Sequence, residues 1–343
     1  MRKAQLSIQF NWIFLLIVGA VIFIFFFLLI SNQQKSSASS QATDLAQGIN
    51  TVLTTLSNEP NALQEYHIPD ANIRFVCEPG LNEYYVLESN PIDITYEPIF
   101  TPKLLEGDAI TTWTSVWQVP FDAATFTYMA DERTLFIFVN STSSPETDSY
   151  LTQLYNRLPK GFAKTHLANT GMVPAYRPKG YDHYIYITSS NRVDELRSQD
   201  LMKGSVIKGL QFDSGGINTY GTVVFSAPGK PAEQSSFLLE SSLWGALFSE
   251  DKEFYECTMN KAINRFLIGA EVLSDRAQSL ASELSFTPCE YQLVRTHTLL
   301  DDMINEASEH TIGEISSQLY AQQSELKQLA SDSLRGNACP YLY

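Results

Sequence analysis

Residues 134–140 read TLFIFVN, and the five residues from Leu135 to Val139 are all large and apolar. A strand with one solvated face alternates apolar and polar residues, and this run does not alternate. The pattern therefore predicts a central strand that is covered on both faces of its sheet. Asn140 closes the strand and begins Asn140-Ser141-Thr142, an acceptor motif for N-linked glycosylation if the loop is exposed outside the cell.

Strands and helices alternate around this run. A strand is predicted before residues 134–140, at Thr125–Ala130. A helix is predicted after them, because Ser144-Pro145-Glu146 is typical of a helix start. Further strands are predicted at 73–77, 84–87, 163–168, 183–188, 205–212 and 222–225, with a short helix at 191–198. The order β-α-β-β-α-β matches a split βαβ unit with extra strands. A three-layer doubly wound sheet is the alternative, because the buried strand needs cover on both faces.

From Phe237 the pattern changes from strands to helices. Helices are predicted at 243–247, 257–284 and 289–309, and from Thr311 until Gly336 stops the last one. We therefore predict an α+β or α/β protein with a mixed-sheet head and a C-terminal helical bundle. The predicted domains are a signal and transmembrane anchor at 1–30, a linker with an amphipathic helix at 31–58, a mixed α/β domain at 59–228 and a helical region at 229–343.

The four cysteines are Cys77, Cys257, Cys289 and Cys339, and no two of them form a CxxC pair. An even number without metal-ligand spacing predicts two disulfides in an oxidising compartment, and four buried thiols are the alternative. In an up-down-up bundle, about 40 Å of helix separates Cys257 from Cys289, too far for a bond between them. Cys339 returns near Cys289, so we expect Cys289–Cys339 and Cys77–Cys257.

Residues 12–30, WIFLLIVGAVIFIFFFLLI, contain no charged side chain. A helix of this length rises about 28 Å, close to the thickness of the bilayer interior, which predicts an N-terminal transmembrane helix. Arg2 and Lys3 precede it, so the positive-inside rule places the N-terminus in the cytoplasm. The predicted location is the cell membrane, with a single span, the lipid bilayer as a partner and an extracellular C-terminal domain.

The segment before the apolar stretch, KAQLSIQF at residues 3–10, resembles the class III signal peptide of archaeal type IV pilin-like proteins. The resemblance implies that a peptidase cleaves between Ala4 and Gln5 and that the apolar segment is retained. The family usually has Glu where this chain has Gln9. That Glu is thought to set the register between subunits, and Gln9 carries no charge for this contact. The resemblance covers only about the first 30 residues, and an ordinary signal anchor is the alternative.

Motifs for catalysis are scarce. The net charge of −15 disfavours nucleic acid as a partner, and we find no GxSxG, P-loop or GxGxxG pattern. His166 and His183 fall on predicted neighbouring strands and could meet, although a structural role is expected for them. Asp301, with Asp302, Glu306 and Glu309, predicts a solvated acidic helix face rather than a cation site. The sequence thus indicates no catalytic, cofactor-binding or metal-binding residue.

These observations favour a pilin-like, membrane-anchored surface protein. Its expected role is adhesion or surface assembly, with membrane or surface proteins, or copies of itself, as partners. The alternative is a membrane-tethered ectoenzyme or a solute-binding domain built on the α/β region. That alternative requires a deep pocket with convergent polar groups at the carboxyl ends of the strands.

Overall fold

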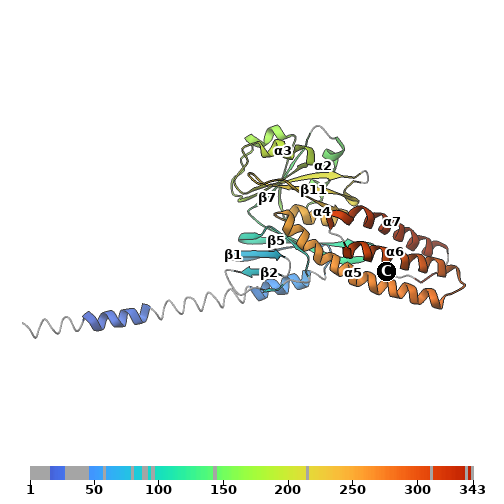
Figure 1. Cartoon of the computed structure of the whole chain (residues 1–343). Coiled ribbons are helices and arrows are strands. Elements are labelled where there is room, and N and C mark those ends of the chain that lie inside the picture. The colour runs from blue at the N-terminus through green and yellow to red at the C-terminus, as the bar shows by residue number, and fades with distance from the viewer. Residues whose placement is uncertain are drawn as a thin grey trace, which may run out of the picture.

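The protein is built on two six-stranded sheets with a helix between them and long helices that extend to one side (Figure 1). The computed structural model describes residues 16–27, 46–56, 59–78, 81–86, 92–93, 97–141, 145–213, 216–309, 312–336 and 339–340.

The first sheet is largely antiparallel and has the strand order β3-β2-β1-β5-β6-β4. Its strands are β1 (Leu63–Glu78), β2 (Leu81–Val86), β3 (Ile92–Asp93), β4 (Ile99–Phe100), β5 (Leu104–Gln118) and β6 (Asp122–Asp131). Along β1, Ile73 and Phe75 are buried while Asn72 and Arg74 are exposed. This period of two is expected for a strand whose two faces differ in burial.

The second sheet has the order β12-β11-β10-β9-β7-β8. Its strands are β7 (Thr134–Val139), β8 (Ala163–Leu167), β9 (His183–Ser189), β10 (Ser205–Phe212), β11 (Tyr220–Ser226) and β12 (Glu233–Leu238). The four strands β8, β7, β9 and β10 are parallel, and β11 and β12 are antiparallel additions. All six residues of β7 are buried, which confirms the prediction of a central strand.

Helices cover both faces of the second sheet. Phe136 and Phe138 pack in one core with Leu151 of α2 (Pro145–Arg157). On the other face, Ile137 packs in a separate core with Leu196 of α3 (Val193–Arg197). Three 3₁₀ turns connect elements around this sheet: η1 (Thr170–Ala175), η2 (Ser190–Arg192) and η3 (Gly216–Asn218).

The split βαβ arrangement is wrong for this sheet. The core strands run parallel, with α2 and α3 on opposite faces, as in the doubly wound alternative. The predicted strand at 125–130 belongs to β6 of the first sheet and does not pair with β7. Both outcomes depend on pairing between strands that are distant in the chain, which local sequence patterns do not specify.

Helix α4 (Leu239–Phe248) forms the layer between the two sheets (Figure 1), and its residues from Ser241 to Phe248 are all buried. A helix that is buried on every side joins the cores of its neighbours. The indole N–H of Trp117 donates to the Leu238 carbonyl at 3.0 Å, and the Tyr128 hydroxyl donates to the Ser241 carbonyl at 2.8 Å. These bonds fix the start of α4 to the first sheet.

Three long helices follow: α5 (Lys252–Glu283), α6 (Pro288–Glu309) and α7 (Ile312–Gly336). One disulfide joins Cys77 of β1 to Cys257 of α5, and the other joins Cys289 of α6 to Cys339 beyond α7. The predicted pairing is therefore confirmed. Two disulfides are typical of an extracellular or secreted protein, because the cytosol keeps thiols reduced.

A helix over residues 46–56 packs on the first sheet. Its Ile49 and Leu53 are buried in one core with Phe75 and Tyr84. The hydroxyl of Tyr84 donates to the Ala46 carbonyl at 2.9 Å. The apolar stripe of this amphipathic segment thus supplies part of the core, as its spacing predicts.

The N-terminal helix requires a correction. The structure describes it over residues 16–27, a length of 12 residues. Such a helix rises about 18 Å, less than the roughly 30 Å of a bilayer interior. Among the described residues, no helix is long and apolar enough to cross a membrane, so the predicted transmembrane helix is not supported. Residues 12–15 and 28–30 of the predicted span lie outside the described residues.

Candidate functional site

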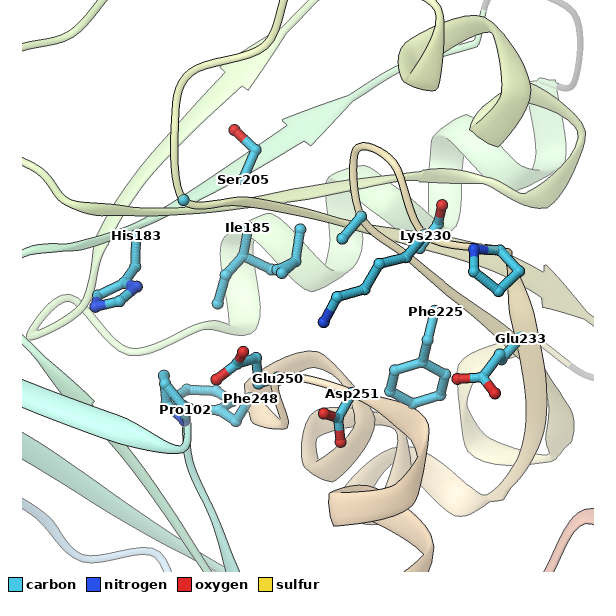
Figure 2. Close-up of a pocket in the computed structure, with 15 residues that line it drawn as sticks. Pro102, His183, Ile185, Ser205, Phe225, Lys230, Glu233, Phe248, Glu250 and Asp251 are labelled. Carbon is cyan, nitrogen blue, oxygen red and sulfur yellow. The ribbon is translucent and has the colours of Figure 1, made fainter. Parts of the chain in front are cut away.

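A cavity of about 370 Å³ lies where the second sheet meets the junction of α4 and α5 (Figure 2). We call it the interface cavity. Its lining includes Pro102 before β5, the starts of β9 and β10, the end of β11, the β11–β12 turn and the α4–α5 junction. Cavities of about 300–1,000 Å³ typically bind small molecules, so the volume suits a small ligand.

Apolar side chains form much of the cavity wall. They include Ile185 of β9, Val206 of β10, Phe225 of β11 and Phe248 at the end of α4. Ile185, Phe225 and Phe248 are buried in the main hydrophobic core, so the core holds them in place. A rigid apolar wall can remove the apolar part of a ligand from water, worth about 25 cal/mol for each Å² buried.

Two lining residues carry a buried polar atom without a hydrogen-bond partner among the described residues, Nε2 of His183 and Oγ of Ser226. Ser226 follows Phe225 on β11 and pairs with Ile207 of the other core, so its hydroxyl lies on the opposite face of the sheet from the Phe225 ring and the cavity. A buried polar atom without a partner costs about 1–3 kcal/mol, so such atoms are uncommon in folded proteins. A polar ligand in the cavity could supply a partner for His183.

Charged side chains of both signs surround the cavity. The amine of Lys230 and the carboxylate of Glu250 both point into it, from the β11–β12 turn and from the α4–α5 junction (Figure 2). Asp251 is already engaged, since it pairs with Lys103 at 2.5 Å and accepts from the Phe254 N–H at 3.0 Å. Burial by itself raises the pKa of Asp251, but these contacts, with the charges of Lys103 and Lys208, together hold it below its ordinary value.

A buried lysine stands behind the cavity wall. Lys208 of β10 is 0% exposed, and its amine lies 4.0 Å from the centre of the Phe225 ring. The amine donates to the carbonyls of Ser249 at 2.5 Å and Glu250 at 3.1 Å, where α4 ends. Burial lowers the pKa of Lys208 to about 7, while the charges of Asp251 and Glu250 favour its protonated form. Lys208 therefore positions the α4–α5 junction, which carries Glu250 into the cavity.

The interface cavity lies at the amino ends of the parallel strands, where His183 begins β9 and Ser205 begins β10. Doubly wound sheets usually bind ligands at the opposite edge. At that edge, Arg192 donates to the Ser141 carbonyl at 3.0 Å and pairs with Glu195 at 2.6 Å. The ectoenzyme or solute-binding alternative required a pocket at the carboxyl ends of the strands. The interface cavity lies at their amino ends and does not meet that requirement.

The two predicted neighbouring histidines do not meet. β7 separates β8, which carries His166, from β9, which begins with His183. His166 instead lies 2.9 Å from Oδ1 of Asn140 and stacks on Tyr155. Burial lowers the pKa of His166, against the charge of Asp148. The contact with Asn140 engages the amide oxygen rather than the nitrogen that would carry a glycan, so glycosylation there stays a prediction.

The predicted acidic face of α6 contains a contact with α5. Asp301 accepts a hydrogen bond from Ser274 at 2.5 Å, and Ser274 Oγ also lies 2.6 Å from Nδ1 of His297. These three residue types can form a hydrolytic triad, but here the serine hydroxyl is directed to the carboxylate. Ser274 is 3% exposed, so the cluster ties two helices together. Among the residues that the structure covers, no group of His, Cys, Asp or Glu forms a metal site.

Sequence reasoning missed the interface cavity. Its residues range from Pro102 to Asp251 and show no local motif. One signal was present: Lys208 interrupts an apolar strand, SVIKGLQF, at a position whose neighbours two residues away are Val206 and Leu210. The predicted processing residues Ala4 and Gln5 lie outside the described residues. Comparison with known protein families, curated proteins and solved structures finds no match to this chain.

Proposed function

We propose that this chain is an extracellular surface protein of the pilin-like type, which assembles with copies of itself and acts in adhesion. The observation that carries the proposal is the helix at residues 16–27. Its large apolar side chains are 38–74% exposed, and they lie on every side of the helix: Leu16, Ile17, Val18, Val21, Ile22, Phe23, Ile24, Phe25, Phe26 and Phe27. A helix that is apolar all round requires apolar neighbours, which the same helix of other subunits would supply.

The disulfides support a role outside the cell. They join β1 to α5 and close the tip of the helical region, through the pairs Cys77–Cys257 and Cys289–Cys339. Disulfides form and persist in oxidising compartments outside the cytosol, and they stabilise the folds that they crosslink. The resemblance of residues 3–10 to a class III signal peptide agrees with export.

Two measurements test this proposal. Mass spectrometry of the mature N-terminus should find Gln5 as the first residue, and a chain that begins at Met1 would reject the signal-peptide interpretation. Light scattering should show that Ile22→Asp prevents assembly, because a charge would enter the apolar contact. The control is Val272→Asp on α5, where the side chain is 63% exposed and the head is expected to be unaffected. Assembly that survives Ile22→Asp would contradict the proposal.

A second candidate function is the binding of an extracellular solute in the interface cavity. The specific observation is that His183, which lines this cavity, has a buried ring nitrogen, Nε2, without a partner among the described residues. A screen of small molecules by thermal unfolding of the full chain tests it. A bound solute should raise the melting temperature in proportion to the logarithm of its concentration above the dissociation constant.

A further inference from the structure

We propose that the interface cavity binds a small zwitterion, a free α-amino acid with an apolar side chain. The ligand carboxylate would lie against Lys230, and its ammonium group against Glu250 and His183. This inference rests on the solute-binding function proposed above and names the class of solute.

Lys230 forms the part of the cavity that suits a carboxylate. It lies in the turn after β11, which is closed by the Lys230 N–H and the Ala227 carbonyl, 3.1 Å apart. The side chain of Lys230 extends from this turn into the cavity (Figure 2), and it makes no ion pair with the residues that the structure describes. A carboxylate would accept charge-assisted hydrogen bonds from this ammonium group.

Glu250 and His183 form the opposite part, which suits an ammonium group. The Glu250 carboxylate points into the cavity on the same side as the imidazole of His183 (Figure 2). One of its oxygens accepts from the Lys103 backbone N–H at 3.2 Å, which leaves acceptor capacity on this side chain. Nε2 of His183, when it carries no proton, is a further acceptor without a partner. An ammonium group has three donors and can satisfy both.

The wall between these two parts selects the side chain of the ligand. Ile185, Phe225 and Phe248 are at most 3% exposed and offer only carbon atoms to the cavity from their side chains. A polar side chain would lose its water there without gaining a partner, which costs free energy. An apolar side chain gains by burial. The combination of two opposite charges and an apolar wall matches an amino acid such as leucine.

The test is titration calorimetry on the full disulfide-bonded chain with L-leucine, leucinamide and N-acetylleucine. Leucinamide lacks the carboxylate and N-acetylleucine lacks the ammonium, so each should bind about tenfold or more weakly than leucine. Glycine and aspartate should also bind more weakly than leucine, because they lack an apolar side chain. The ligand series needs no mutation, so it stays informative even if a variant fails to fold.

Variants of the chain test which residue contacts the carboxylate of the ligand and which contacts its ammonium group. Lys230→Met and Glu250→Gln should each weaken leucine binding about tenfold or more. The matched controls, Lys179→Met and Glu271→Gln, alter exposed side chains outside the cavity and should leave the affinity unchanged. Lys230→Met should also abolish the preference for leucine over leucinamide, which a purely structural role of Lys230 would not do.

The possible failures are distinct. If leucinamide and N-acetylleucine bind as tightly as leucine and compete with it, the zwitterion is wrong and the solute-binding function stands. If neither the amino acids nor the wider small-molecule screen shows binding, both proposals are wrong. If leucine binds but Lys230→Met and Glu250→Gln bind it as the wild type does, the interface cavity is not its site.

Discussion

Replacement of Lys208 by methionine should change how the stability of the protein depends on pH. The Lys208 amine is fully buried, and its pKa is about 7 in the folded protein against 10.5 when solvated. Between these two values the unfolded chain binds a proton that the folded chain has released. The free energy of unfolding therefore rises with pH across this window and is insensitive to Lys208 below it.

The magnitude follows from the two pKa values. At about 1.4 kcal/mol for each pH unit, the shift from 10.5 to about 7 corresponds to roughly 5 kcal/mol in total. About 4 kcal/mol of this should appear between pH 6 and pH 10, because each titration is spread over about two units. The quantity to measure is the unfolding free energy of the wild type minus that of Lys208→Met.

Urea unfolding with the disulfides intact, followed by tryptophan fluorescence, provides the assay. Two of the four indoles, Trp117 and Trp244, are buried in the main core and should respond to its loss. The difference should be flat below pH 7 and then increase in favour of the wild type. Lys179→Met, which alters an exposed lysine, should give a flat difference throughout. A flat difference for Lys208→Met would refute the reasoning, since the amine would then be solvated or charged throughout.

Other predictions concern packing and crosslinks. Gly245→Ala should destabilise the fold by about 1–3 kcal/mol, because a Cβ at this position of α4 would lie 2.8 Å from the Phe100 ring. Gly48→Ala should instead stabilise it by about 0.5–1 kcal/mol, since this helical glycine faces open space. Urea unfolding measures both, and loss of stability in Gly48→Ala would contradict the second. Replacing both Cys289 and Cys339 by serine should cost about 4 kcal/mol, and the same change at Cys77 and Cys257 about 5 kcal/mol, because the loops span 50 and 180 residues. Equal losses for the two pairs would show that loop length does not determine how much each disulfide stabilises the fold.

The two sheets show where prediction from the sequence reached its limit. The uniform apolar run of β7 could mean only a strand covered on both faces, because any exposed face would leave large side chains in water. The strands that pair with β7 could not be predicted from its own sequence. β6 is joined to β7 by a two-residue connection, yet it pairs with β5 in the other sheet. The choice between a split and a doubly wound arrangement therefore depended on contacts across the whole chain.

At the N-terminal stretch, the prediction went further than the structure supports. The absence of charge over residues 12–30 predicted a complete membrane span from composition alone. The structure describes a shorter helix, of 12 residues, within it. Apolar composition requires an apolar environment but does not by itself define the length of the helix or the nature of its neighbours.

The sequence by itself determined the central strand, the C-terminal helices and the pairing of the cysteines. Local periodicity specifies an element, and the length of a helix limits which cysteines can meet. Only the tertiary structure decided the strand order and the interface cavity. Lys230, Glu250 and His183 lie far apart in the chain and share no motif. They meet because α4 packs between the sheets and the Lys208 amine holds the carbonyls at its end. A site of this kind is created by folding, and its residues acquire their roles from their neighbours in space.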